Sequence, residues 1–394
     1  MFQSVKQQKA ILLTVITIFW FSQYVYVPYQ ATYLTSMYVV PLLIGVIVGA
    51  YGFSQFALRM PIGLLADRKA RHKPFIQLGV LLAGTASLFR ILYPNEKGYL
   101  IGSILSGCAS AMWISFMILY FTYYEQENLQ QASGIVVGAN NMGILIGFLA
   151  GTLLYEHYGM QLLCALSFLL AIPAFFLSCF IKEAKSDEKA LPVKELVQVY
   201  RNKRLIVFSL LALIQQGVQL STAMSFTAKV AQSRGATSVQ IGLCSLIYIL
   251  TAVISSYFTA SKAAQKSGAR IWIPTILLCL IAYCILIPNL PSVEWIYAAQ
   301  ILSGLSTGIL FSFCTSEAMK EVPKAKHSTA MGFYQAIYAI GMTTFPMITG
   351  AITGKFSIHT AYYVLAGMTV TGLAGAILFY YPKARADTKK EKAS

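Results

Sequence analysis

The chain has 394 residues, of which 57% are hydrophobic and only 11% are charged. Soluble domains carry about 25% charged residues, so these charges are too few to cover such an apolar chain in water. Lipid is the alternative solvent, and a helix that spans a bilayer needs about 20 mostly apolar residues. The composition therefore excludes an ordinary soluble domain and favours an integral membrane protein.

Apolar runs of this length recur along the whole chain, and short polar segments separate them. They predict twelve membrane-spanning helices, which in chain order are 10–34, 40–65, 75–93, 98–123, 132–154, 160–181, 205–228, 237–258, 271–288, 295–317, 328–351 and 358–381. An even number of spans places both chain termini on the same side of the membrane.

The positive charges alternate from one connection to the next. Twenty-four of the 30 Lys and Arg residues lie in the two tails and in every second connection. Membrane proteins carry such an excess in their cytoplasmic segments. The pattern predicts a multi-pass protein of the plasma (inner) membrane with both termini in the cytoplasm. It also accounts for the net charge of +16 without nucleic acid as a partner.

A single long polar stretch divides the spans into two groups of six. We therefore predict an N-terminal bundle at 1–181, a cytoplasmic linker at 182–204, and a C-terminal bundle with a cytoplasmic tail at 205–394. Residues 104–116 and 301–313 are identical at six of 13 positions. This repeat predicts two pseudo-symmetric six-helix bundles, an architecture that transporters use with a site at the bundle interface.

The connection after the second span carries a recognisable motif. It resembles the signature loop of the major facilitator superfamily (MFS), Gly-x-Leu-Ala-Asp-Arg-x-Gly-Arg-Lys, and the matching residues are Gly63, Leu65, Ala66, Asp67, Arg68 and Arg71. It departs from the motif at Ala70 and His72. The resemblance implies an all-α membrane protein with the MFS fold, which transports a solute by alternating access and is not an enzyme.

The same loop is a candidate gate. Gly63 lets two helices approach closely, and Asp67 can accept hydrogen bonds from a helix N-terminus, which the resemblance suggests is that of span eleven. Arg68 and Arg71 can pair with carboxylates. The alternative is a solvated charge run that only sets the topology. The corresponding loop of the second half has Gln265 in place of the Asp, so the gate is expected to be asymmetric.

Other charged residues near or within the spans extend this set. Glu125 and Glu317 end spans four and ten, where they either pair with loop Arg residues as gates or are solvated. Arg59 lies one turn inside span two, and Arg90 lies late in span three. We expect both to extend their head groups to the membrane surface. The alternative is that a buried Arg attracts an anionic substrate.

Polar side chains within the spans are the candidate substrate ligands, because such residues tend to face the bundle interior. Spans one and seven each carry them on one helical face. The predicted substrate-binding residues are Gln23, Tyr26, Gln30, Trp113, Asn140, Asn141, Gln215, Gln219, Tyr334 and Tyr338. The resemblance places spans one, four, seven and ten around the cavity. The alternative is that these groups only join helices by hydrogen bonds.

The carboxylates constrain the mechanism. All 14 Asp and Glu residues map to loops, tails or span ends, so a proton carrier at mid-membrane is not evident. The glycines at 143–151 are similar to the family's antiporter motif, although Phe148 replaces its Pro. We expect a monomeric secondary transporter that exports a neutral or amphipathic small molecule in exchange for protons or another solute.

Two further alternatives remain open. One is uptake of a polar metabolite by symport or uniport, and the other is a sensor or receptor on a transporter scaffold. The sequence contains no phosphate-binding loop, because Thr349 stands where its first Gly is required. The four His residues are scattered without metal-ligand spacing. No cofactor and no metal are therefore expected.

Overall fold

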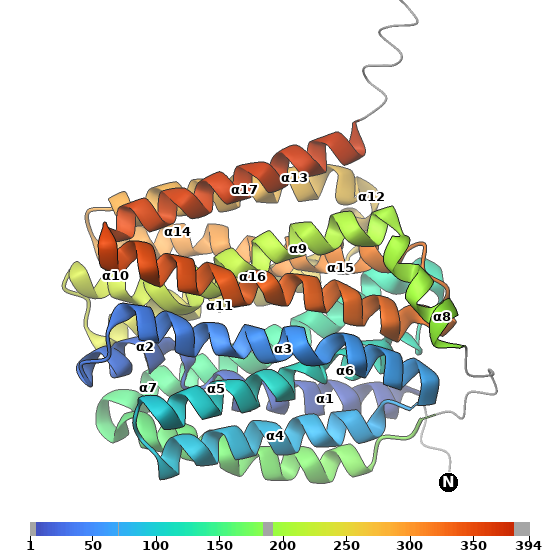
Figure 1. The fold of residues 1–394 in the computed structure, drawn as a ribbon, viewed down its shortest axis with the longest axis horizontal. Coiled ribbons are helices and arrows are strands. Elements are labelled where there is room, and N and C mark those ends of the chain that lie inside the picture. The colour runs from blue at the N-terminus through green and yellow to red at the C-terminus, as the bar shows by residue number, and fades with distance from the viewer. Residues whose placement is uncertain (1–4, 70, 184–191, 382–394) are drawn as a thin grey trace, which may run out of the picture.

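The structure is a computed structural model that describes residues 5–69, 71–183 and 192–381. Both tail ends and the centre of the predicted linker lie outside these ranges. All regular elements in the described part of the chain are helical. The long helices lie roughly parallel in Figure 1, with the first half of the chain below and the second half above.

The helices follow the predicted spans closely. Their bounds are α1 Val5–Tyr24, α2 Val27–Ser36, α3 Pro41–Lys69, α4 Lys73–Leu92, α5 Glu96–Ala111, α6 Trp113–Phe121, α7 Leu129–Cys179, α8 Val193–Leu196, α9 Lys203–Ser221, α10 Thr227–Ser233, α11 Ser238–Thr259, α12 Lys262–Ser267, α13 Ala269–Leu286, α14 Val293–Leu305, α15 Phe311–Met319, α16 His327–Lys355 and α17 Ile358–Tyr380. The short helix α8 lies within the predicted linker. Helices α1 and α17 have their chain-terminal ends on the right in Figure 1, and we call this side of the bundle the termini end.

Helix α7 contains two spans. Its 51 residues correspond to about 77 Å of helix, which is more than twice the thickness of a hydrocarbon core. Gly159 interrupts it with φ 69° and ψ −170°, a backbone conformation that is accessible essentially only to glycine. Eleven helical stretches of the described chain are long and apolar enough to cross a membrane, and the break at Gly159 divides one of them, so there are twelve spans.

The two halves repeat the same packing at matching positions. A Cβ at Gly107 of α5 would lie 2.3 Å from the carbonyl oxygen of Tyr51, and one at Gly304 of α14 would lie 2.4 Å from that of Tyr248. The hydroxyl of Tyr51 lies 2.8 Å from that of Ser110. The Tyr248 hydroxyl in turn lies 3.0 Å from that of Thr307. Each residue and its counterpart are separated by the same interval, so the two bundles are pseudo-symmetric.

Two helix pairs form the most extensive contacts between the halves, α3 with α16 and α7 with α11. The face of α3 toward α16 is rich in glycine. Added Cβ atoms at Gly45, Gly49, Gly52 and Gly63 would each lie 2.9 Å or less from backbone atoms of α16. Glycine allows this close backbone approach because it has no side chain. The α3–α16 contact therefore runs along most of both helices.

Candidate functional site

Four spans change their backbone geometry partway along their length. Span one is broken between α1 and α2, where Pro28 has no N–H to donate to the helix. Met112 separates α5 from α6 in span four. Spans seven and ten each contain a π-helical turn, at Thr222–Phe226 and Ser306–Leu310. Discontinuous spans and π-turns often mark binding sites, because they alter the direction of side chains and backbone groups.

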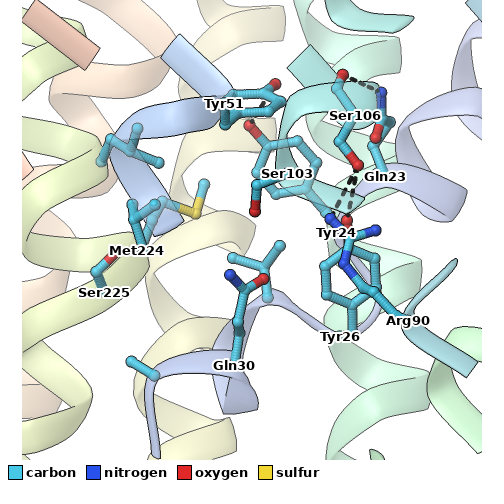
Figure 2. A pocket seen from close by; sticks show the side chains of 14 residues that line it. Gln23, Tyr24, Tyr26, Gln30, Tyr51, Arg90, Ser103, Ser106, Met224 and Ser225 are labelled. Carbon is cyan, nitrogen blue, oxygen red and sulfur yellow. Dashed lines mark hydrogen bonds between the residues drawn. The ribbon is translucent and has the colours of Figure 1, made fainter. Parts of the chain in front are cut away.

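A first cavity lies beside these breaks, on the side away from the termini end. We call it the distal cavity, and its polar lining includes Gln23, Tyr26, Gln30, Arg90, Ser103 and Ser106 (Figure 2). Its volume is about 50 Å³, enough for a few water molecules. Met224 and Ser225 of the second half complete the wall. A small organic molecule would enter only after the two halves move apart.

A second cavity, the central cavity, lies nearer the termini end. Its volume is about 40 Å³, and its lining includes Arg59, Trp113, Asn140, Asn141, Gln219 and Tyr338. Aromatic rings surround it, since Trp20 lies 5.3 Å from Trp113 between ring centres and Phe311 lies 5.8 Å from Tyr338. Tyr24 and Tyr51 line both cavities. The two spaces are therefore neighbours that share part of their walls.

The amide of Gln23 joins span one to span four at the distal cavity. Its Nε2 donates to the carbonyl oxygen of Ser106 at 3.0 Å and to the hydroxyl of Ser110 at 3.1 Å. The hydroxyl of Tyr26 lies 3.3 Å from that of Ser106. These contacts hold the polar face of span one against α5. They show that this face points into the bundle, as the spacing predicts.

Arg59 does not extend to the membrane surface, so that expectation is wrong. Its side chain is buried, with Nη1 donating to the carbonyl oxygen of Gln335 at 2.9 Å and Nη2 to that of Ser110 at 3.5 Å. The guanidinium carbon lies 4.4 Å from the ring centre of Tyr338. Arg59 therefore joins the two halves at the central cavity.

Arg90 is also buried, which corrects the second surface expectation. Its Nη2 donates to the hydroxyl of Ser106 at 3.0 Å, and its guanidinium carbon lies 4.3 Å from the ring centre of Tyr26. Gly102 of α5 leaves the room for this side chain, because a Cβ there would lie 2.8 Å from Nε. The close packing of α4 on α5 keeps the guanidinium group at the cavity wall instead of the lipid surface.

The remaining predicted ligands divide into two groups. Asn140 and Asn141 line the central cavity, and Asn141 also donates to the hydroxyl of Ser256 in the second half at 2.8 Å. Gln215 lines neither cavity; its amide donates to Gln219 at 2.9 Å. Tyr334 lines neither cavity and lies 3.2 Å from the hydroxyl of Thr315. These last two residues support the site from behind.

The predicted contact of Asp67 with span eleven is confirmed. Its carboxylate accepts hydrogen bonds from the backbone N–H of Ser328 at 3.0 Å, and from the N–H and hydroxyl of Thr329 at 2.6 Å each. These N–H groups are the unpaired donors of the first turn of α16. We call this contact the Asp67 latch, and it joins the two halves at the termini end.

The other predicted gating residues differ in their contacts. Arg68 and Arg71 are exposed, and neither pairs with a carboxylate of the described chain, contrary to the expectation. Glu317 forms ion pairs with Arg204 and Lys320. Glu125 lies 3.6 Å from Lys324 of the other half, but both side chains are largely exposed, so this pair contributes little.

Several lining residues were missed by the sequence reasoning. Trp20, Tyr24, Tyr51 and Gln55 lie at the cavity walls, but each belongs to an apolar stretch that resembles a lipid-facing segment. Span four carried a usable signal, because its serines at 103, 106 and 110 repeat at helical spacing. That small polar stripe faces the cavities and the two buried Arg side chains.

Twelve spans in two matched bundles, with broken helices around polar cavities, are features of known transporter folds. The sequence profile of the Major Facilitator Superfamily matches residues 12–229 and 216–394. The chain therefore belongs to the Major Facilitator Superfamily, and its curated relatives in this family are membrane transporters, not enzymes.

Curated relatives support this assignment, and a solved structure shows the same fold. The chain is 22% identical over 357 residues to the inner membrane transport protein YajR of Escherichia coli K12, covering 89% of this chain and 75% of the relative. It is 26% identical over 320 residues to the multidrug resistance protein MdtG of Salmonella choleraesuis, covering 78% of each. The crystal structure of the human organic anion transporter MFSD10 (TETRAN) has the same fold, with a TM-score of 0.77 at 14% identity over 95% of this chain and all of that chain.

Proposed function

We propose that this chain is a monomeric carrier that exports a small organic solute across the inner membrane by alternating access. The observation that carries the proposal is the pair of polar cavities between the halves, which lie where four spans are broken. A carrier needs such a site at the interface of two bundles that rock against each other. We take 1–181 and 205–394 as these moving units and 182–204 as their linker.

The direction of opening follows from the proposed topology. With both termini in the cytoplasm, the Asp67 latch lies on the cytoplasmic side and stabilises the outward-facing state. Its hydrogen bonds to Ser328 and Thr329 must break for the site to open inward. Export in exchange for protons or a counter-solute is supported by the likeness to MdtG, a multidrug resistance protein.

A binding screen followed by a flux assay tests this function. Ligands of the native state raise the apparent melting temperature of the purified protein. Each ligand found in this way is then measured for flux in liposomes that contain the protein. We expect flux that saturates and that requires the Gln23 amide, because this group joins spans one and four at the distal cavity.

The matched comparison is Gln23→Ala with Gln232→Ala, since Gln232 is an exposed amide of α10 outside the cavities. We expect at least tenfold weaker transport for Gln23→Ala and unchanged transport for Gln232→Ala. Binding without net flux would indicate a receptor instead of a carrier. Uptake driven by an inward proton gradient would indicate that the protein is a symporter and not an exporter.

A further inference from the structure

Two positive charges lie inside the membrane region without a counter-ion. The side chains of Arg59 and Arg90 are only 1% and 2% exposed. Neither forms an ion pair with a carboxylate in the described ranges. An unpaired buried charge is strongly unfavourable. An ionisable residue at this depth therefore indicates a functional site whose partner carries the opposite charge.

Each guanidinium group has donors left over at a cavity. Nε and Nη1 of Arg90 have no hydrogen-bond partner among the described residues, and Arg90 lines the distal cavity (Figure 2). Nε of Arg59 has none either, and Arg59 lines the central cavity. Such groups can donate only, because a guanidinium has no acceptor. A ligand that binds these donors must therefore supply an acceptor group.

The two groups are arranged along one helix. Arg90 donates to Ser106 and Arg59 donates to the carbonyl of Ser110, which follows one turn later on α5. One helical turn advances about 5.4 Å. The Gln23 amide contacts both serines. An acceptor group that leaves one Arg can therefore reach the other through a short movement along α5.

The rest of the walls accept an apolar body. Trp20, Trp113 and Phe311 line the central cavity, and aromatic rings bind apolar and aromatic groups by stacking and edge contacts. The neutral amides of Asn140 and Gln219 add hydrogen-bonding groups without charge. The walls thus combine a cationic end with an aromatic surface.

We propose that, given the transport function above, the cargo is an amphipathic organic anion whose carboxylate, sulfonate or phosphate group binds Arg59 and Arg90 in turn. Its apolar part lies against the aromatic residues of the central cavity. The sequence predicts a neutral or amphipathic cargo. The burial of both Arg head groups at the cavities favours an amphipathic cargo that carries a negative charge.

Three probes with one ring system and different charges test the proposal. They are naphthalenesulfonate, naphthylmethanol and naphthylmethyl-trimethylammonium, each added to the purified protein while its melting temperature is measured. We expect only the anion to raise the melting temperature. Arg90→Gln and Arg59→Gln should each weaken the apparent affinity for the anion by about tenfold to a hundredfold, as for loss of a charge-assisted hydrogen bond.

Arg201→Gln is the matched control, because Arg201 is exposed in the linker region, and it should bind the anion as the unchanged protein does. Arg90→Gln and Arg59→Gln each remove an unpaired buried charge, so the melting temperature measured without probe should be unchanged or higher. This measurement distinguishes a loss of binding from a loss of folding. Arg90→Lys keeps the charge with fewer directed donors and should bind with intermediate affinity.

The proposal is overturned if the neutral or cationic probe binds the unchanged protein as tightly as the anion. It is also overturned if both Gln variants keep the original affinity. Flux of labelled probe in liposomes distinguishes failure of the anion site from failure of the transport function. Flux without preference for the anion removes the anion site alone. Anion binding without flux removes the carrier function and leaves the site.

Discussion

Two crossings join the halves at the termini end, and they use different chemistry. In the Asp67 latch, a carboxylate accepts three hydrogen bonds from the first turn of α16. At the other crossing, the Gln130 amide of α7 donates to the carbonyl of Thr259 at 3.4 Å, and a Cβ on Gly134 would lie 3.0 Å from the side chain of Ala260. We call this second crossing the Gln130 contact.

The difference lies in one residue type. Gln265, which replaces the Asp in the second-half loop, donates to the carbonyl of Ala260 in its own loop and does not reach α7. The predicted difference between the two loops is therefore found in their contacts, and their role as a gate stays a prediction. Hydrogen bonds to a charged group contribute about 1.5–3 kcal/mol and neutral ones about 0.5–1.5 kcal/mol. Similar helix packing can thus give a strong and a weak closure in one molecule.

Asp67→Asn should have the largest effect on this comparison. The substitution removes the charge that faces the α16 N-terminus and places an N–H₂ group against other donors, at an expected cost of about 2–4 kcal/mol. The population with an open termini end should rise about thirtyfold or more. Spin labels at Lys69 and Lys266, on exposed sites of opposite halves, would report longer distances.

Glu127→Gln is the control for this experiment, because Glu127 is an exposed carboxylate at the same end. It changes the net charge equally but contacts neither crossing. An unchanged distance distribution in Asp67→Asn would mean that the carboxylate does not hold the end closed.

Gly63→Ala should have the next largest effect. A Cβ at this position would lie 2.5 Å from the carbonyl oxygen of Ser328, so α3 and α16 must separate, at a cost of about 1–3 kcal/mol. The melting temperature should fall. Gly367→Ala in α17 has nothing within 4 Å of the added atom and should show no loss. Equal melting temperatures for the two variants would refute the close crossing.

Gln130→Ala should have a smaller effect than Asp67→Asn. It removes neutral hydrogen bonds to Thr259 and Ser316, which together contribute about 1 kcal/mol. With the same spin labels, the open population should increase about fivefold. If this change equalled or exceeded that of Asp67→Asn, the charged crossing would not be the stronger one.

The last effect concerns pH at the start of α4. Burial lowers the pKa of His72 to about 4, so the folded protein disfavours its protonated form. The unfolded chain takes up the proton first as the pH falls from about 6.5. Stability should therefore decrease between about pH 6.5 and 4.

The His72 contribution is about 1–2 kcal/mol after allowance for its partial exposure. His72→Gln removes it and should flatten the dependence of the melting temperature on pH in this window. Comparison of the two proteins at each pH cancels the effect of other titrating groups. Parallel curves for the two proteins would contradict a lowered pKa of His72.

The fold was largely predictable from the sequence. Apolar runs and alternating charges depend only on the order of residues, so they gave twelve spans, and even the short break between spans five and six falls at Gly159. The contact of Asp67 with α16 was implied by the family resemblance of the loop, and the carboxylate accepts hydrogen bonds from the first turn of that helix.

The site was only partly predictable. The faces of span one and Asn141 point inward as their spacing indicates. The buried positions of Arg59 and Arg90 were not predicted, because the rotation of a helix about its axis depends on its neighbours. Arg90 needs the space above Gly102, a residue on another helix. The residue pattern of a single span does not show how its side chains pack against another span.

The glycine-rich face of α3 has a consequence for how the halves move. Ridges of interlocking side chains resist rotation of one helix over another, but at Gly45, Gly49 and Gly52 the backbone of α3 lies directly on that of α16. A surface without protruding groups allows rolling with little repacking. The α3–α16 contact, which joins the two bundles, is thus also suited to be their axis of rotation. A single methyl group added to this face of α3 would hinder that rotation.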